Sequence, residues 1–259
     1  MDDTIRHIAD LLSNAQGIVV LTGAGISAES GLRTFRGATA ADLPPNMAAL
    51  WKEFDPMKLA TPEAFDADPA AVSKWYDWRR LGCLAADPNP GHFALADIEQ
   101  RRGSSRFTLL TQNVDRLHQK AGSQNVVELH GSIIQWRCTE CDTKITPAAE
   151  PMPNFPLGAS CCPDDSTAIL RPDVVWFGEQ LPFEALRAAD EALQSCDLFL
   201  SIGTSSVVHP AASFIQVASS NGAHTVEINP EATPISRLVD HSLRGKSGDI
   251  LPRIVAAMK

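Results

Sequence analysis

The chain has 259 residues, of which 44% are hydrophobic and 20% are charged, a composition typical of a globular protein with one large α/β domain and a smaller attachment. The 22 Lys and Arg residues stand against 31 Asp and Glu residues, a formal net charge of −9, so nucleic acid is not expected as a partner. No apolar run approaches the ~20 residues needed to span a bilayer, which excludes a membrane-spanning helix.

The first residues predict a helix, because Ile5, Ile8, Leu11 and Leu12 have helical spacing. This segment lacks a basic start followed by an apolar run, and it is not rich in Arg and Ser. We therefore expect neither a secretory nor a transit peptide, and a cytoplasmic protein. No heptad pattern or self-complementary stripe is evident, so a monomer is expected.

Short apolar runs then alternate with helical stretches, the pattern of a parallel sheet with helices on both faces. This predicts a Rossmann-like α/β fold. The expected strands are residues 18–21, 107–110, 126–129, 198–202 and 225–228. Each is followed by a polar, Gly-containing or Asn-containing segment, where open α/β sheets bind their ligands.

Two stretches interrupt the alternation. One is helical and rich in tryptophan, and the other is rich in Cys and Pro with little periodicity. We expect these insertions, residues 38–84 and 136–168, to form a smaller helical and zinc-binding domain. The Rossmann-type domain would then consist of residues 1–37, 85–135 and 169–259.

A glycine-rich turn follows the first expected strand. Gly23-x-Gly25 before a helix start allows a backbone to approach a pyrophosphate, although an ordinary glycine turn is the alternative. The next glycine, Gly31, comes six residues after Gly25, and no acidic residue ends a second strand about 20 residues later. The pattern therefore disfavours a hydride-transferring dehydrogenase and favours a nucleotide held by other means.

Polar side chains follow the other strands. Gln112, Asn113 and Asp115 follow one strand, and His130 follows the next. A histidine can serve as a general base near neutral pH, whereas each residue taken singly is as well explained as a helix cap. Their shared place at the ligand edge of the sheet favours a site, and residues 203–205 and 229–231 would complete a nucleotide cleft along that edge.

At this point the chain resembles the sirtuin family, over nearly its whole length. The motifs that carry the resemblance are residues 23–27 (GAGIS), 34–37 (TFRG), 111–118 (TQNVDRLH), 128–131 (ELHG), 171–179 (RPDVVWFGE) and 203–205 (GTS). The resemblance implies a Rossmann-type domain and a zinc-bearing small domain, with NAD and acylated protein lysine meeting between them. It also implies NAD-consuming lysine deacylation, which yields nicotinamide, O-acyl-ADP-ribose and free lysine.

The resemblance also implies residue roles. His130 would be the general base on a ribose hydroxyl, Asn113 would position the ribose or a water, and Asp115 would hold the nicotinamide amide. NAD contacts are expected from Gly23, Ala24, Gly25, Ser27, Phe35, Arg36, Gln112, Asn113, Asp115, Gly203, Thr204, Ser205, Asn229, Pro230, Glu231 and Ser247. An exposed edge formed by Val175, Trp176, Phe177 and Gly178 would pair with the substrate peptide through its main chain.

Four cysteines predict one structural zinc ion. Cys138-x-x-Cys141 is a half-site for tetrahedral zinc, but the second half is an adjacent pair, Cys161 and Cys162, where the family has two separated cysteines. Adjacent side chains diverge. Three alternatives therefore stay open: both bind with a distorted backbone, a following Asp supplies the fourth ligand, or the site holds zinc poorly. We expect Cys138, Cys141 and Cys161 as ligands, with Cys162 as the fourth.

The acyl group is expected to meet Tyr76 and Arg79. Three positions apart on a helix, they share a face, and a phenol with a guanidinium suits a carboxylate; simple packing is the alternative. The pair resembles the sirtuin branch that removes succinyl, malonyl and glutaryl groups, in which Ala60 and Phe65 would line the acyl chain. Arg80 competes for the cationic role, but it points about 100° away on a helix.

Two rival functions remain. The first is a plain deacetylase, or one that also transfers ADP-ribose. The second is a non-catalytic NAD-binding scaffold, which would have no need of His130, Asn113 and Asp115 together.

Overall fold

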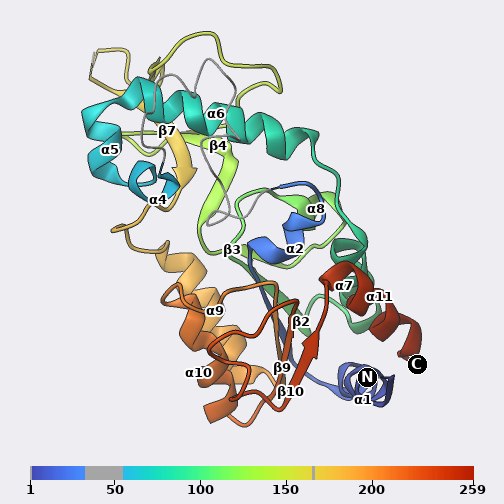
Figure 1. Ribbon diagram of the computed structural model, residues 1–259. Helices are drawn as coiled ribbons and strands as arrows, with labels where there is room; N and C mark the ends of the chain where they lie inside the picture. The colour runs from blue at the N-terminus through green and yellow to red at the C-terminus, as the bar shows by residue number, and fades with distance from the viewer. Residues whose placement is uncertain (1, 33–54, 165–166) are drawn as a thin grey trace.

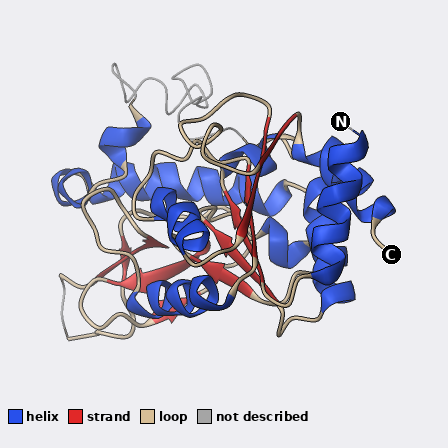
Figure 2. Ribbon diagram, turned by 90° about the horizontal axis from the view of Figure 1, so that it is seen from below, coloured by secondary structure: helices blue, strands red, loops and turns tan. Residues whose placement is uncertain are grey.

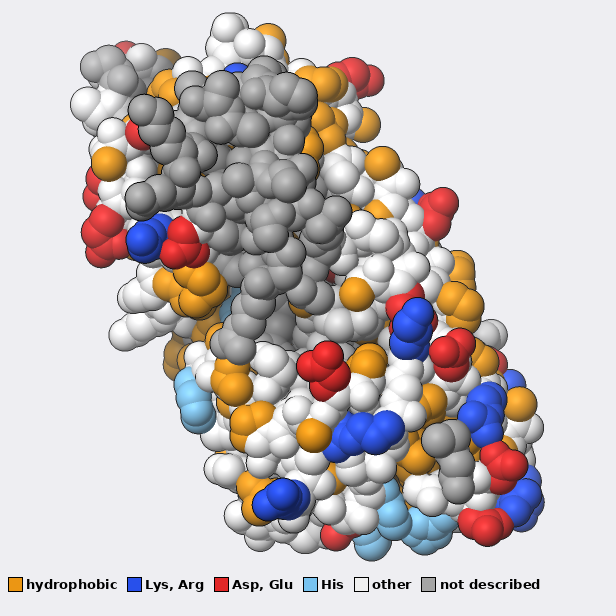
Figure 3. Space-filling model, in the orientation of Figure 1, with side chains coloured by type: hydrophobic (Ala, Val, Ile, Leu, Met, Phe, Trp, Pro, Cys, Tyr) orange, Lys and Arg blue, Asp and Glu red, His pale blue; other side chains and the backbone are white. Residues whose placement is uncertain are grey.

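A computed structural model describes residues 2–32, 55–164 and 167–259. A large α/β unit carries a smaller unit above it, and the two chain ends lie close together on the large unit (Figure 1). No helix in the described ranges is long and apolar enough to cross a membrane. Acidic and basic side chains are intermingled on the described part of the face in Figure 3, so the acidic surplus is not gathered in one patch there.

The large unit is built on a parallel sheet, as predicted. Its strand order is β3-β2-β1-β8-β9-β10. The strands are β1 (Ile18–Thr22), β2 (Phe107–Thr111), β3 (Val126–Glu128), β8 (Leu198–Ile202), β9 (His224–Asn229) and β10 (His241–Arg244). The first five are confirmed. The sixth was missed because it is a short edge strand in which only Leu243 is buried, so it has no apolar run.

Helices cover both faces of this sheet (Figure 2). One face packs against α1 (Asp2–Asn14), α7 (Pro90–Arg102) and α11 (Ser247–Ala257). The other packs against α9 (Phe183–Ser195), the 3₁₀ turn η2 (Ala211–Ser213) and α10 (Phe214–Ser220). Burial on both faces explains why β1 and β8 are almost entirely apolar, with only Thr22 and Ser201 as polar residues.

The small unit combines helices with a second sheet. Its helices are α4 (Pro56–Leu59), α5 (Pro62–Ala67) and α6 (Pro69–Ala85), the last two capped by Thr61 and Asp68 ahead of a first-turn proline. They pack against an antiparallel sheet ordered β5-β4-β7-β6, formed by β5 (Lys144–Ile145), β4 (Gly131–Cys138), β7 (Ile169–Val174) and β6 (Leu157–Gly158).

The second sheet was not foreseen. Two of its strands have only two residues each, and the pairing of β4 with β7 shifts between Ser132 and Trp136. The sequence therefore shows no regular alternation of apolar and polar residues there. Because β4 begins at Gly131 and β7 ends at Val174, this sheet extends beyond the expected insertion of residues 136–168. The helices expected in residues 38–84 are present in the described part of that range.

Candidate functional site

The strand order of the large sheet reverses between β1 and β8, and the glycine-rich turn lies there. The N–H of Gly25 donates to the carbonyl of Gly203 at 2.7 Å. A Cβ atom on Gly203 would lie 2.5 Å from the nitrogen of Ile26, and Gly203 has a φ of +59°. Only glycine fits both conditions. The glycine-rich turn and the end of β8 therefore pack backbone against backbone, at the point where doubly wound sheets bind nucleotides.

Ser27, on the short helix α2 (Ala24–Ala28), joins two of the expected catalytic residues. Its hydroxyl donates to Asp115 Oδ2 at 2.8 Å and accepts from Asn113 Nδ2 at 3.0 Å. Asp115 also accepts the N–H of Leu117, at the start of α8 (Leu117–Lys120). Burial raises the pKa of Asp115, and the hydrogen bonds from Leu117 and Ser27 partly offset it.

His130 lies at the same edge, directly after β3. Its Nδ1 lies 2.9 Å from the carbonyl oxygen of Gln112. Since a carbonyl only accepts, Nδ1 carries the proton in the neutral ring and Nε2 is left as the base. Burial lowers the pKa of His130, so the ring is neutral at physiological pH. Gln112 in turn donates through Nε2 to Thr204 Oγ1 at 3.0 Å, which ties this edge to β8.

Two buried histidines beneath this cluster were not singled out from the sequence. His118 Nε2 lies 2.9 Å from Thr22 Oγ1, His92 Nε2 lies 3.4 Å from Ser27 Oγ, and the two ring centroids are 4.9 Å apart. Burial lowers the pKa of His92 to about 4 and that of His118 well below its usual value. The role of His92 in the helix cap could have been inferred from the sequence, because it stands three residues after Asn89, which caps α7, and the two form a capping box.

The remaining expected NAD contacts are spread along the same edge. Asn229 Nδ2 donates to the carbonyl of Thr204 at 3.2 Å, while Ser205, Pro230 and Glu231 are exposed. Ser247 Oγ donates to Glu29 Oε1 at 2.9 Å, so the hydroxyl of Ser247 is engaged within the protein. Phe35 and Arg36 lie outside the described residues.

The expected acyl-binding residues meet in the core of the small unit. Tyr76 is 2% exposed and accepts a hydrogen bond from Trp176 Nε1 at 3.0 Å. Phe65 packs against Trp176 with ring centroids 5.1 Å apart, and Ala60 is buried in the same cluster. The Arg79 guanidinium lies 5.4 Å from the centroid of the Tyr76 ring.

Arg80 is engaged in the interior of the small unit. It has no exposure, pairs with Asp77 at 2.7 Å, and donates to the carbonyls of Ala148 and Glu150 at 2.7 Å each. Arg79 and Arg80 therefore point in different directions, as the helical spacing predicts.

The four residues expected to form an exposed edge, 175–178, differ in exposure. Trp176 is buried, and Phe177 and Gly178 are exposed residues in a turn. The N–H groups of Val175 and Phe177 already donate to the carbonyls of His130 and Ala60, at 3.0 and 2.8 Å. These two hydrogen bonds tie the segment to His130 and Ala60, and its pairing with a substrate peptide stays a prediction.

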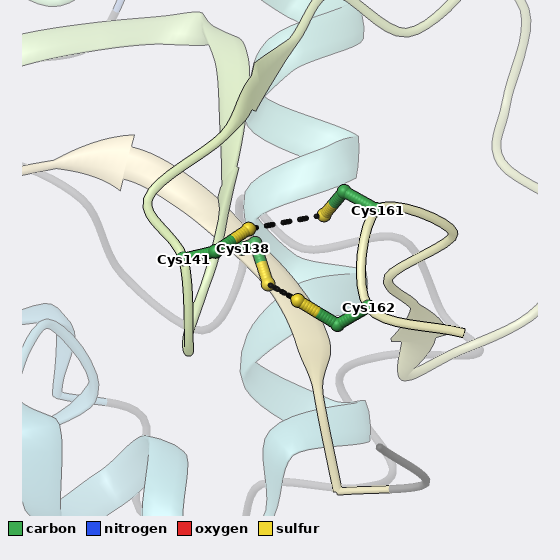
Figure 4. Close-up of side chains that lie close together, drawn as sticks. All are labelled: Cys138, Cys141, Cys161 and Cys162. Atoms are coloured by element: carbon green, nitrogen blue, oxygen red, sulfur yellow. Dashed lines mark hydrogen bonds between the residues drawn. The ribbon is translucent and has the colours of Figure 1, made fainter. Parts of the chain in front are cut away.

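The four cysteines converge, as Figure 4 shows. The sulfurs of Cys138, Cys141, Cys161 and Cys162 all lie within 4.8 Å of one another, and all four are free thiols. The Cys141–Cys161 and Cys138–Cys162 sulfur distances are 3.4 and 3.8 Å, close to the roughly 3.8 Å expected of a tetrahedron with Zn–S bonds of about 2.3 Å. The N–H of Glu140 points at the Cys138 sulfur, at 3.4 Å.

The cluster therefore fits one structural zinc ion, with Cys162 in the place of the fourth ligand. Each member of the adjacent pair faces a different cysteine of the first half-site, so divergence of their side chains is what the site needs. Asp164 is not part of the cluster, and Asp165 lies outside the described residues.

Comparisons with known proteins agree with this geometry. Residues 23–210 match the Sir2 family. The chain is 47% identical to NAD-dependent protein deacylase 2 of Pyrobaculum aerophilum, over 98% of the chain and 95% of that protein. It is 44% identical to NAD-dependent protein deacylase 1 of Pseudomonas aeruginosa, over 97% and 98%.

Solved structures show the same likeness. A crystal structure of a Sir2 homolog–NAD complex superposes with a TM-score of 0.85 at 40% identity, covering 96% of this chain and 92% of that one. A Sir2 structure with a deacetylated peptide and 3′-O-acetyl ADP-ribose superposes with a TM-score of 0.81 at 29% identity, covering 98% and 99%. Motifs, fold and relatives together place the chain in the Sir2 family, the family of the sirtuins.

Proposed function

We propose that this chain removes acyl groups from protein lysine in a reaction that consumes NAD, and that it prefers acyl groups ending in a carboxylate, such as succinyl, malonyl or glutaryl. The products would be nicotinamide, O-acyl-ADP-ribose and free lysine. NAD supplies the ribose carbon that receives the acyl oxygen when nicotinamide leaves. The cytoplasmic location and monomeric state expected from the sequence remain part of this proposal.

The catalytic part of the proposal rests on His130. With Nδ1 bonded to the Gln112 carbonyl and the pKa lowered by burial, Nε2 is available to take a proton from a ribose hydroxyl at neutral pH. Asn113 and Asp115 are held by Ser27, which suits them to orient the ribose and the nicotinamide amide. The glycine turn would take the pyrophosphate.

The acidic-acyl preference is carried by one observation. Tyr76 is fully buried beside Arg79, yet its hydroxyl proton has no acceptor among the residues that the structure describes. Burial raises the pKa of Tyr76 to about 12, so the phenol remains a donor at physiological pH. A carboxylate would accept this proton and pair with Arg79, each contact contributing about 1.5–3 kcal/mol. An acetyl group would offer the Tyr76 hydroxyl no carboxylate to accept its proton.

The test is a paired turnover assay. One peptide carries either succinyl-lysine or acetyl-lysine, NAD is added, and free nicotinamide and deacylated peptide are followed. We expect faster succinyl turnover and a loss of about 10- to 150-fold in the succinyl-to-acetyl ratio in Arg79→Met. The matched control is Arg187→Met, because Arg187 is an exposed arginine on α9, where it pairs with Glu184 and Glu191.

The other outcomes are as informative. Faster acetyl turnover would select the plain deacetylase and contradict the carboxylate pocket. Absence of NAD-dependent turnover with either peptide would contradict the enzymatic proposal itself.

A further inference from the structure

The hydroxyl of Tyr76 is held by one partner, the indole of Trp176. Both residues are 2% exposed, and the Nε1–Oη distance is 3.0 Å. The equally buried indole of Trp136 lies in the same core, but its Nε1 has no partner in the described part of the chain. A buried indole of this core therefore does not always have a hydrogen-bond partner among the described residues, and the Trp176–Tyr76 hydrogen bond is a specific feature.

This hydrogen bond sets the direction of the Tyr76 proton. The phenol oxygen accepts the N–H of Trp176 through one of its lone pairs. The hydroxyl proton is therefore directed away from the indole. Donation from Trp176 also polarises the Tyr76 O–H bond and makes it a stronger donor.

The indole itself is held from three directions. The Arg171 guanidinium lies 3.4 Å from the centroid of the Trp176 ring. Glu179 Oε2 accepts a hydrogen bond from the backbone N–H of Trp176 at 2.8 Å. The Glu179 carboxylate also accepts hydrogen bonds from both terminal nitrogens of Arg171, at 2.6 and 3.0 Å. Phe65 packs on the remaining side, with its ring centroid 5.1 Å from that of Trp176. The indole N–H is therefore fixed in direction before any substrate binds.

We infer that Trp176 is a positioning residue for acyl specificity: its indole N–H holds the Tyr76 hydroxyl so that the proton of Tyr76 is presented to the carboxylate of the acyl group. This inference rests on the proposed acidic-acyl function and deepens it. Trp176 does not touch the carboxylate, and its effect passes entirely through Tyr76. A neutral acyl group gains nothing from it.

The test is a double-mutant cycle with Trp176→Phe and Tyr76→Phe, measured with succinyl-lysine and acetyl-lysine peptides. We expect Trp176→Phe to lower the succinyl-to-acetyl ratio of kcat/KM by about 3- to 10-fold, mainly through KM for the succinyl peptide. In the Tyr76→Phe background the same change should have no further effect on the ratio. Trp136→Phe is the matched control, because it removes a buried indole whose N–H has no acceptor among the described residues; it should leave the ratio unchanged.

A spectroscopic readout keeps the inference testable if turnover is low. Tyr76 is the only tyrosine in the chain, so 3-fluorotyrosine labelling gives one fluorine resonance. We expect Trp176→Phe to shift this resonance and Trp136→Phe to leave it in place. If Trp176→Phe does not fold, the labelled wild-type protein should still respond more to succinyl-lysine peptide than to acetyl-lysine peptide, and an equal response would overturn the inference.

The two hypotheses fail differently. If Tyr76→Phe and Arg79→Met leave the succinyl-to-acetyl ratio unchanged, the acidic-acyl function is wrong. If those two variants lower the ratio but Trp176→Phe does not, or its effect adds fully to that of Tyr76→Phe, only the role of Trp176 is wrong.

Discussion

Two regions of the molecule differ in whether their buried polar groups are hydrogen-bonded within the protein. At the cofactor edge, the carboxyl end of the large sheet, Ser27, Asn113 and Asp115 bond to one another. In the proposed acyl pocket, around Tyr76 and Trp176, the Tyr76 hydroxyl proton has no acceptor among the described residues although Tyr76 is buried. A saturated network fixes geometry, whereas a spare buried donor costs free energy until a ligand accepts from it.

The difference follows from how each region is built. The cofactor edge uses the ends of neighbouring parallel strands, so the sheet itself brings distant residues together. The acyl pocket is assembled from α5, α6 and the turn after β7, which are joined by side-chain packing. We therefore expect the cofactor edge to tolerate changes in the small unit, while specificity depends on how that unit is packed.

The largest expected effect comes from removing zinc, which should damage the small unit and spare the sheet. Structural zinc sites contribute on the order of 10 kcal/mol to folding. Cys162→Ser should lower the zinc content below one ion per chain and lower the melting temperature, measured by metal analysis and calorimetry. Cys196→Ser, a buried thiol outside the cluster, should retain the zinc. Full zinc content in Cys162→Ser would restore the three-cysteine alternative.

The neighbouring arginines of α6 separate stability from specificity. Arg80 is buried and paired with Asp77, so Arg80→Met leaves a buried carboxylate unpaired and should cost about 3–5 kcal/mol of unfolding free energy. Arg79→Met should cost far less stability and change the acyl preference instead. Denaturant unfolding of both variants checks this, and equal losses of stability would contradict the assignment of Arg79 to the pocket.

Much of this contrast could be predicted from the sequence. Strands buried on both faces appear as apolar runs, and their polar ends carry the motifs, so the sheet and its edge were found directly. The pocket depended on helical spacing at Tyr76 and Arg79, which placed the pair and set Arg80 apart. Trp176 was predicted as part of an exposed edge, and the burial of its side chain was not foreseen, because a motif shows which residues are present but not which way an indole turns.

What escaped prediction lacks a local pattern. The second sheet consists of short strands and of a longer pair, β4 and β7, whose register shifts between Ser132 and Trp136. The pairing of the adjacent cysteines depends on the path of their loop, which spacing alone does not give. His92 and His118 support the cofactor edge from helices that follow different strands, and only tertiary packing brings their rings together.

Catalysis tests the cofactor edge itself. His130→Ala should lower deacylated-peptide formation by about 10²- to 10⁴-fold, the usual contribution of a general base, with succinyl and acetyl peptides affected alike. His224→Ala, an exposed histidine on β9, is the control. Wild-type rates in His130→Ala would contradict the assigned base.

The smallest expected effect is on stability against pH, and it arises beneath the cofactor edge. Burial lowers the pKa of His92 from 6.5 to about 4 in the folded protein. Between these values the unfolded chain takes up a proton that the folded protein refuses, so stability is fully present above pH 6.5 and falls as the pH drops toward 4. At roughly 1.4 kcal/mol per pH unit, His92 accounts for a loss of about 3 kcal/mol.

His118 acts in the same direction, whereas the raised pKa of Asp115 acts against it, because the folded protein binds that proton before the unfolded chain does. The contribution of His92 is therefore isolated by difference. His92→Gln should flatten the fall in unfolding free energy between pH 6.5 and 4, measured by denaturant titration at each pH, while His224→Gln should leave it as steep as in the wild type. An unchanged slope in His92→Gln would mean that the ring takes up its proton inside the folded protein. His92 would then be packed less tightly beneath the cofactor edge than its hydrogen bonds indicate.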